Sequence, residues 1–215
     1  MSAYDYCFKV LVLGESNAGK TSICTRISGT SPNIDVTPTI GVEFYSYSFV
    51  SSEGPSIKCQ VWDLAGAQLY RSIVKDYYKE VAAAIIVFDV SSRLSFSQVA
   101  HWHSELQEAE LSDPLGILLI GNKTDKRRLI TRGEGEELAR SLSVRYAETS
   151  ALKGDPRKCI SEFLESLLKL EHMPKHKGIK RFPTRDPYAS LDARALLPSK
   201  ARFVRQRCRC LCCCL

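Results

Sequence analysis

The sequence predicts an α/β protein in which a mostly parallel sheet carries helices on both faces. Apolar, strand-like segments alternate along residues 6–171 with helix-like segments of about 10–15 residues, which is typical of βαβ units. A glycine-rich turn follows the first strand-like segment directly, and polar residues follow two later ones. Together these observations predict a six-stranded sheet with one antiparallel edge strand, flanked by about five helices.

The first part of the chain supplies the first helix and the antiparallel pair. Phe8–Leu13 is apolar and β-branched, which predicts a buried strand, and a helix is expected over Thr21–Ser28. Val42–Val50 and Ile57–Asp63 are two strand-like runs separated by a cluster of Ser, Gly and Pro. This arrangement predicts an antiparallel hairpin that forms one edge of the sheet.

The rest of the body continues the strand–helix alternation and contains no internal repeat. Each strand-like run is short and apolar, and each helix-like run is longer and amphipathic. The expected strands are Ala83–Asp89, Gly116–Asn122 and Val144–Thr149, and the expected helices are Leu94–Glu110, Arg132–Leu142 and Pro156–Glu171.

Charge divides the 215 residues into a body and a tail. Residues 174–215 hold eleven basic and two acidic residues, a net charge of +9, whereas residues 1–173 hold 19 basic and 22 acidic residues, a net charge of −3. Prolines interrupt the basic segment, so we expect one domain over 1–173 and a flexible tail over 174–215. Such asymmetry is typical of a tail that contacts nucleic acid or an anionic membrane.

Composition excludes several classes of protein. The chain is 44% hydrophobic and 25% charged, which is typical of a globular domain rather than of a disordered or fibrous chain. The longest apolar run, 81–88, is far shorter than the roughly 20 residues of a membrane-spanning helix, and the N-terminus does not resemble a secretory signal. Five of the nine cysteines fall in the last eight residues, a distribution unlike a disulfide framework or a zinc site.

Residues 14–21 read Gly-Glu-Ser-Asn-Ala-Gly-Lys-Thr, the pattern G-x-x-x-x-G-K-[ST]. Gly14 and Gly19 allow the backbone to turn tightly and approach a phosphate, and successive N–H groups then face the anion. Lys20 supplies a positive charge for the β- and γ-phosphates, and Thr21 a hydroxyl for Mg²⁺. A glycine turn with a chance lysine is the alternative, and the strand before and helix after the motif disfavour it.

Two further polar segments indicate which base is bound. Asn122-Lys-Thr-Asp125 and Thr149-Ser-Ala151 each end a predicted strand, and ligands bind at the carboxyl ends of parallel strands. A carboxylate at Asp125 can accept two hydrogen bonds from guanine, whereas adenine would leave that acceptor unmatched. Alone, the four-residue segment could be a polar loop; in register with the phosphate loop it indicates guanine.

With these motifs in order, the chain resembles the small GTPases, and the Rab family among them. The resemblance covers about residues 6–170 and implies the P-loop NTPase fold called the G domain. Besides the phosphate loop and the base segments, it rests on 39–44, 58–66, 70–73, 77–78 and 87–90.

The resemblance implies a role for each site residue. Asp125 would read guanine, Lys123 would lie along the base, Asn122 would brace the loops, and the Ala151 amide would meet the guanine oxygen. Thr21 and Thr39 would bind Mg²⁺ directly and Asp63 through water, while the catalytic set would be Lys20, Thr39 and Gly66. The full set implied to bind GTP or GDP is Gly14, Glu15, Ser16, Asn17, Ala18, Gly19, Lys20, Thr21, Ser22, Thr39, Asp63, Gly66, Asn122, Lys123, Asp125, Ser150, Ala151 and Leu152.

The resemblance also implies a surface that partners read. Phe44, Trp62 and Tyr77 resemble the aromatic patch by which Rabs present their switch loops to effector proteins, with Ile40 and Gly41 beside it. Plain packing beneath the switches is an equally weighted alternative for each aromatic ring, because buried aromatic residues usually serve the core.

One position departs from the family pattern. The family normally has glutamine directly after the switch glycine, where it orients the attacking water. Here that residue is Ala67, and Gln68 follows one position later. A methyl group cannot orient water, and neighbouring side chains on a loop usually point apart. We therefore expect slow hydrolysis, with Gln68 a weak candidate to substitute.

The C-terminus predicts a lipid anchor. Cys212 is the fourth residue from the end of the chain and leucine is the last, which fits prenylation of a C-a-a-X motif, although Rabs usually end in Cys-Cys or Cys-x-Cys. The neighbouring basic residues supply the second signal that stable anchoring needs. A solvated tail that binds nucleic acid is disfavoured by the cysteine cluster. The candidates for lipidation are Cys208, Cys210, Cys212, Cys213 and Cys214.

These features lead to two functional readings. The first is a Rab-like molecular switch in vesicle trafficking, which would use GTP, GDP and Mg²⁺ at the cytoplasmic face of an intracellular or plasma membrane and be cytosolic when extracted. Its partners would be effectors, an exchange factor, a GTPase-activating protein and the prenylation machinery, with no nucleic acid. The second reading is a GTP-loaded, non-cycling scaffold on a membrane. A P-loop ATPase or kinase is disfavoured by Asp125.

Overall fold

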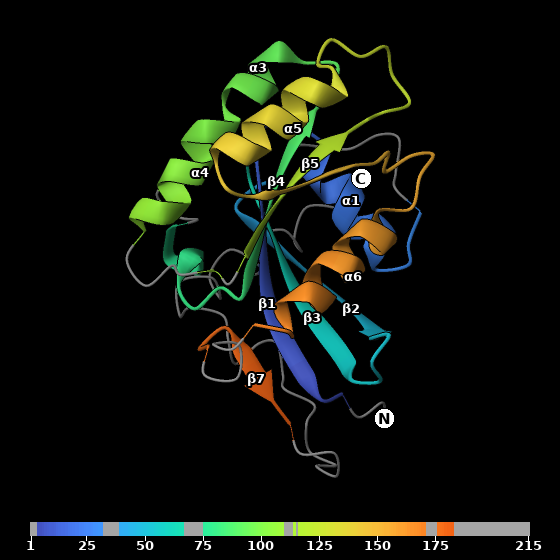
Figure 1. Ribbon diagram of the computed structural model, residues 1–215, viewed down its shortest axis with the longest axis vertical. Coiled ribbons are helices and arrows are strands. Elements are labelled where there is room, and N and C mark those ends of the chain that lie inside the picture. Colours follow the sequence, from blue (N-terminus) through green and yellow to red (C-terminus); the bar gives the residue numbers. More distant parts are fainter. Residues whose placement is uncertain are drawn as a thin grey trace, which may run out of the picture.

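The structure is a computed structural model that describes residues 4–31, 39–66, 75–109, 114, 116–170 and 176–182. A single sheet runs through this part in the order β2-β3-β1-β4-β5-β6, and β7 pairs with β1 beside that path (Figure 1). The strands are β1 (Tyr6–Leu13), β2 (Val42–Val50), β3 (Ser56–Leu64), β4 (Ala83–Asp89), β5 (Gly116–Asn122), β6 (Arg145–Glu148) and β7 (Ile179–Arg181).

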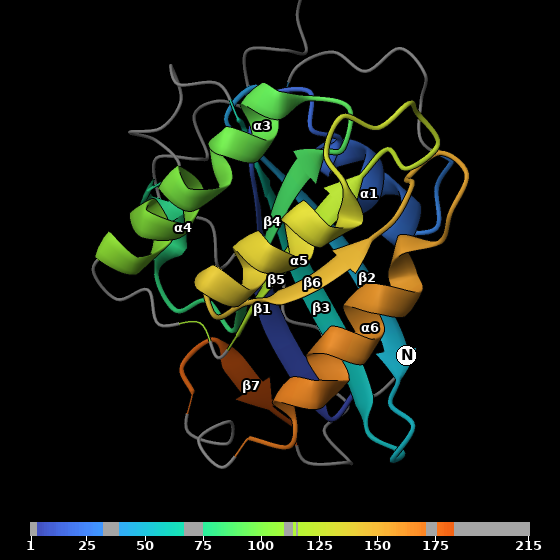
Figure 2. The same cartoon turned by 45° about the horizontal axis from the view of Figure 1, so that its top comes forward.

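Helices cover both faces of the sheet, as the alternation predicts. The pair α1 and α6 lies on one face, and α3, α4 and α5 lie on the other (Figures 1 and 2). None of the helices in the described ranges is long and apolar enough to cross a membrane. The helices are α1 (Lys20–Ile27), α3 (Arg93–Ser97), α4 (Val99–Glu108), α5 (Arg132–Ser141) and α6 (Pro156–Leu167), with a 3₁₀ helix, η2, at Lys75–Tyr78.

Strand pairing confirms the predicted α/β class. β1 runs parallel to β3 and β4, and β5 runs parallel to β4 and β6. β2 is antiparallel to β3 and forms the edge, with Phe44 opposite Trp62. The carboxyl ends of β1, β3, β4, β5 and β6 therefore meet at one edge of the sheet, which is where ligands bind in such folds.

Alternation along β1 divides the core into two layers. Val10 and Val12 pack with the cluster that includes α1 and α6, whereas Leu11 and Leu13 pack with the cluster on the α4 side. All four side chains are buried. Each buried aliphatic side chain of this kind stabilises the fold by about 1.5–3 kcal/mol, so β1 holds the two layers together.

Helix starts follow local capping chemistry. The Thr131 hydroxyl accepts a hydrogen bond from the Glu134 amide at 3.2 Å, and the Glu134 carboxylate accepts one from the Thr131 amide, which completes a capping box for α5. Asp155 caps α6, and Pro156 occupies its first turn.

One predicted helix is in fact two. The sequence predicts a continuous helix over Leu94–Glu110, but the structure has α3 and α4 with a break at Gln98. Ser92 caps α3 by accepting a hydrogen bond from the Ser95 amide, so the first helix begins one residue early. The apolar periodicity continues through the break, which is why it predicted one helix.

β7 was not predicted from the sequence. It lies within 174–215, the range assigned to the flexible tail, and pairs antiparallel with β1 over Tyr6–Phe8, at the end of β1 where β4 has not yet begun. Phe182 packs edge-to-face on Tyr4, with ring centroids 5.3 Å apart. Three strand residues, of which Lys180 and Arg181 are both charged, show too little alternation to be recognised. The predicted domain boundary itself stays a prediction.

Gly178 is the tightest point of the β7 attachment. A Cβ placed there would lie 2.4 Å from the Ala82 nitrogen and 2.6 Å from the Glu80 carbonyl oxygen. The Gly178 carbonyl accepts a hydrogen bond from the Lys9 amide at 3.0 Å. Glycine therefore lets the C-terminal segment approach the backbone of the turn before β4.

We expect Gly178→Ala to detach β7 from the sheet, because the added methyl group collides with backbone atoms that cannot move aside. The Lys9 amide should then exchange with solvent at least about tenfold faster in hydrogen–deuterium exchange. Gly133→Ala is the matched control, since a Cβ there meets nothing within 4 Å. Unchanged protection of the Lys9 amide in Gly178→Ala would contradict this account.

Candidate nucleotide-binding site

The turn between β1 and α1 has the geometry of a phosphate-binding loop. Gly14, Asn17 and Gly19 all have positive φ angles, of 134°, 63° and 93°. A Cβ at Gly14 would lie 2.2 Å from the Val87 carbonyl oxygen, so the turn packs directly on β4. No side chain caps α1 at Gly19, which leaves the N–H groups of its first turn for an anion.

Lys20 lies at the centre of the site and is only 6% exposed. Its ammonium donates to the carbonyl oxygens of Gly14, at 2.9 Å, and Glu15, at 3.0 Å. Burial lowers the pKa of Lys20, while the negative charge of Asp63 opposes that shift. An ammonium has three donors, so one N–H remains for a phosphate oxygen.

Three oxygen-bearing side chains from three segments converge beside Lys20. The Thr21 hydroxyl donates to Asp63 Oδ2 at 2.5 Å and lies 2.8 Å from the Thr39 hydroxyl. Because Thr21 has one proton to give, the Thr39 hydroxyl is the donor in the second bond. The phosphate loop, the segment before β2 and the end of β3 thus meet at one point.

The same group fits a magnesium ion. Asp63 is fully buried, and its Oδ1 atom has no hydrogen-bond partner among the described residues. Burial raises the pKa of Asp63 to about 6, which the hydrogen bond from Thr21 and the charge of Lys20 only partly offset. Mg²⁺ prefers hydroxyl, carboxylate and phosphate oxygens, so a bound ion would satisfy the orphaned atom and compensate the buried charge.

Gly66 closes the site from the end of β3. A Cβ there would lie 2.5 Å from the Gly14 carbonyl oxygen and 2.6 Å from the Lys20 ammonium, so only glycine fits. The Ala65 amide donates to the Gly41 carbonyl at 2.9 Å, which joins the segment after β3 to the start of β2. Lys20 and Gly66 of the predicted catalytic group therefore lie side by side, and Thr39 contacts Thr21, the neighbour of Lys20 in the chain. Their catalytic role stays a prediction, and Ala67 and Gln68 lie outside the described residues.

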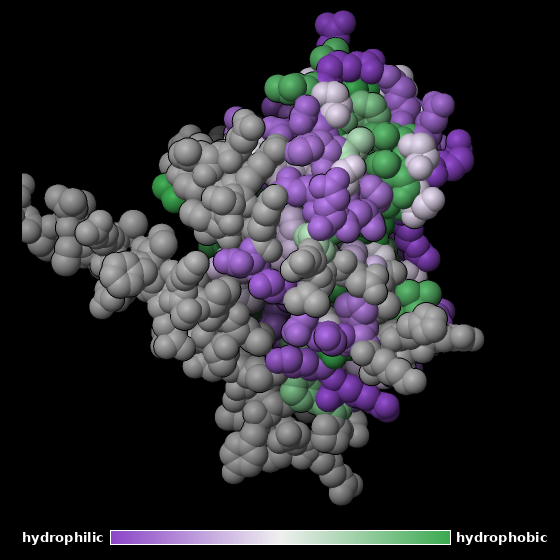
Figure 3. Space-filling view, turned by 90° about the vertical axis from the view of Figure 1, so that its left-hand side faces the viewer, coloured by the Kyte–Doolittle hydropathy of each residue, from purple (hydrophilic) through white to green (hydrophobic). Residues whose placement is uncertain are grey.

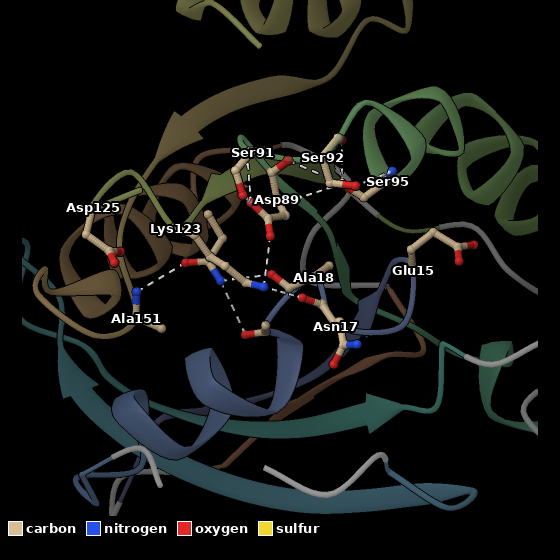
Figure 4. A network of polar contacts seen from close by, with 12 residues as sticks. Glu15, Asn17, Ala18, Asp89, Ser91, Ser92, Ser95, Lys123, Asp125 and Ala151 are labelled. Carbon is tan, nitrogen blue, oxygen red and sulfur yellow. Dashed lines mark hydrogen bonds and ion pairs between the residues drawn. The ribbon is translucent and has the colours of Figure 1, made fainter. Parts of the chain in front are cut away.

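Asn122 braces the other end of the site. Its amide nitrogen donates to the Ala18 carbonyl at 3.0 Å, and its amide oxygen accepts from the Ala151 amide at 3.1 Å (Figure 4). A Cβ at Gly19 would lie 2.3 Å from the Asn122 nitrogen, so this contact also depends on glycine. One side chain therefore fixes the phosphate loop to the loop after β6.

Asp125 and the loop after β6 form the expected base end. The buried Ser150 hydroxyl donates to Asp125 Oδ1, and it also accepts from the Lys153 amide at 2.9 Å. The Ala151 amide, expected to meet guanine, already donates to Asn122, so a base would share or replace that bond. Leu152, which follows Ala151, is 55% exposed.

Asp89 is a site residue that sequence reasoning did not single out. It ends β4 and forms an ion pair with Lys123 at 2.8 Å, and Lys123 in turn donates to the Asn17 carbonyl (Figure 4). Burial alone would raise the pKa of Asp89, but hydrogen bonds from Lys123 and Ser91 outweigh it and hold the pKa below its usual value. The sequence feature that could have identified Asp89 is its position at the carboxyl end of a predicted strand, where ligands bind in such sheets.

Lys123 is held in an unusual backbone conformation. Its φ angle is 63°, in the left-handed region that few non-glycine residues adopt. Such strain persists where surrounding contacts determine it, here the bonds to Asp89 and Asn17. The remaining predicted residues, Glu15, Ser16 and Ser22, lie in the phosphate loop or the first turn of α1.

The aromatic patch is largely interior. Phe44 packs edge-to-face on Trp62, with centroids 5.0 Å apart, and Trp62 lies 5.3 Å from Tyr77. Trp62 is 2% exposed and Tyr77 6%, which favours the packing alternative for these two rings. Ile40 is 67% exposed, and Gly41 and Phe44 are partly exposed, so these members of the predicted patch are accessible.

The fold and this geometry define a P-loop nucleotide-binding protein of the α/β class. The model of the Ras family matches residues 9–170, and Ras-related protein Rab11E of Lotus japonicus is 36% identical over 171 residues, which are 78% of this chain and 77% of that protein. The chain therefore belongs to the Ras family and is a Rab-like small GTPase, as its sequence motifs predict. Members of this family are GTPases that bind GTP or GDP with Mg²⁺.

We expect Asp89→Asn to speed the release of bound nucleotide by about tenfold, because Lys123 would lose its charge partner and with it a charge-assisted hydrogen bond. The off-rate of a fluorescent GDP analogue measures this directly. Glu136→Gln is the matched control, since it removes an exposed ion pair with Arg132 on α5. Equal off-rates in the two variants would show that Lys123 is positioned without Asp89.

Proposed function

We propose that the protein is a membrane-anchored molecular switch that binds GTP and GDP with Mg²⁺ and acts in intracellular vesicle trafficking. One observation carries the switch: the Thr21 hydroxyl lies within hydrogen-bond distance of both the Thr39 hydroxyl and the Asp63 carboxylate, although the three residues come from three separate segments. A ligand bound where the three segments meet would hold them together, so their order would depend on that ligand.

Each residue has a role in this mechanism. Lys20 places a positive charge against the β- and γ-phosphates, and the loop amides orient them. Bound Mg²⁺ would supply positive charge that neutralises the phosphates, held by Thr21, Thr39 and, through water, Asp63. The Gly66 amide would contact the γ-phosphate. Asp125 would select guanine, with Lys123 along the base.

Hydrolysis would remove the contacts that order the segments carrying Thr39 and Gly66. Effectors that bind only the ordered form would then distinguish GTP from GDP, through Ile40, Gly41 and the neighbouring aromatic residues. An exchange factor and a GTPase-activating protein would set the rates of the cycle, as they do for Rab proteins generally.

The tail would provide the membrane anchor. Its five cysteines lie outside the described residues, so prenylation by the prenylation machinery, with palmitoylation as the second lipid, is proposed from sequence alone. A prenyl group with a second lipid or with the basic residues beside it would hold the protein stably at the cytoplasmic face of a membrane. The extracted form would be cytosolic.

A second candidate function is a GTP-loaded scaffold that does not cycle. Ala67 carries this alternative, because an alanine cannot orient the water that attacks the γ-phosphate. Nucleotide would then act as a structural cofactor that keeps the three segments together. The two candidates differ in the fate of bound GTP.

We expect the purified protein to retain guanine nucleotide and, in Mg²⁺, to convert GTP to GDP over hours, as measured by chromatography of the released nucleotide. Asp125→Ala should lower the preference for GTP over ATP by at least about a hundredfold, since no acceptor remains for the guanine edge. Intact GTP after hours would favour the scaffold. Equal affinity of the unmodified protein for ATP and GTP would refute the proposed specificity.

We expect Ala67→Gln to raise the single-turnover rate of GTP hydrolysis by about tenfold or more, because an amide side chain would orient the attacking water. Gln68→Ala serves as the companion variant. If Gln68→Ala abolishes hydrolysis while Ala67→Gln has no effect, Gln68 performs the orientation. Equal rates in all three proteins would refute a role for either position.

A further inference from the structure

A second cavity lies outside the nucleotide site, with a volume of about 270 Å³. It is on the sheet face that carries the α4-side core, at the end where β7 joins β1. Residues from four segments line it: β1, β3, the segment that begins in η2, and the β7 segment. Its lining includes the aromatic residues Trp62 and Tyr77 and the lysines Lys9, Lys79, Lys177 and Lys180.

Positive charge predominates around this cavity. Lys9, Lys79, Lys177 and Lys180 line it, against two acidic residues, Asp76 and Glu80. On the side of the molecule seen in Figure 3, hydrophilic side chains gather over much of the surface that is not grey. Lys177 and Lys180 belong to the segment that β7 attaches, so the attachment builds the basic wall.

One donor inside the cavity is incompletely satisfied. Lys9 donates to the Lys79 carbonyl and lies 5.9 Å from the centre of the Trp62 ring, and burial lowers its pKa to about 8 even though Glu80 lies near enough to oppose that shift. The Trp62 ring, which is 2% exposed, forms the wall behind this ammonium. A carboxylate oxygen in the cavity would offset the cost of burying the Lys9 ammonium.

We infer that this cavity binds an acidic side chain from a partner protein, with Lys9 as its inner contact, the Trp62 ring as the wall behind Lys9, and Lys177 and Lys180 as its rim. The inference rests on the proposed function, because Trp62 packs against Phe44 of the predicted effector patch. A partner seated on the accessible part of that patch would place an acidic segment against the basic wall. Charge complementarity would then add specificity and speed association.

A protein segment fits this site better than a membrane surface. The cavity holds one or two side chains, which suits an inserted carboxylate. Asp76 and Glu80 are exposed residues of the same lining, and an extended anionic surface would meet both of them. A peptide can instead place a single carboxylate between the lysines, where the local charge is positive.

The test uses the full chain labelled with ¹⁵N, whose only two tryptophans, Trp62 and Trp102, each give an indole signal in a two-dimensional NMR spectrum. The probes are a short oligoglutamate peptide and the matched oligoglutamine peptide. Oligoglutamate should shift the Trp62 signal and leave Trp102 unchanged, and oligoglutamine should shift neither. The double variant Lys177→Glu with Lys180→Glu should bind oligoglutamate about tenfold more weakly.

Lys158→Glu is the matched control, because this exposed lysine lies on α6 away from the cavity. Equal binding of oligoglutamate to the control and the double variant would overturn the inference, as would equal shifts from both peptides or none at millimolar peptide. Vesicles containing phosphatidylserine that bind only when Lys177 and Lys180 are present, without a peptide response, would assign the site to a membrane and also overturn it. The nucleotide content of the same samples tests the proposed function separately. Peptide binding to the cavity can be measured whether or not the protein contains guanine nucleotide.

Discussion

The structure depends on keeping one cation, the Lys20 ammonium, out of water. A buried charge is costly unless partners surround it, and here two backbone carbonyls and the nearby charge of Asp63 do so. The carbonyls come from the phosphate loop, so the loop must curl back over its own helix. That curl requires positive φ angles at Gly14 and Gly19, and it requires Gly66 because no side chain fits against the ammonium.

The compensation is incomplete, so a ligand at this site would complete it. Lys20 retains one donor beyond its two carbonyl partners, and Asp63 retains a buried oxygen with no partner in the described part of the chain. A phosphate would supply the acceptor that Lys20 lacks, and a divalent cation would supply the charge that Asp63 lacks. Thr39 joins this group through its hydroxyl contact with Thr21, so under the proposed function its segment would be released when the ligand changes.

Local patterns were sufficient for most of the fold, because each strand and helix up to residue 171 carries its own periodicity or capping residues. The break at Gln98 was not predicted, because the apolar periodicity continues through it, and the strand β7 was not predicted, because its pairing with β1 is a contact distant in sequence. The phosphate loop was recognisable because a phosphate constrains residue type at fixed spacing. Asp89 was not recognised, because its role arises from Lys123, which lies 34 residues later and reaches it only in the folded chain.

The basic cavity and the predicted Mg²⁺ site both use residues of β3, but they lie on opposite faces of that strand. Trp62 and Asp63 are neighbours on β3 and point to opposite faces, so one lines the cavity and the other faces Thr21. β3 is paired along both sides, with β1 and with β2, which leaves it little freedom to move. A nucleotide bound beside Asp63 and a ligand bound beside Trp62 would therefore lie on opposite faces of one firmly paired strand, so each site is built by its own set of side chains.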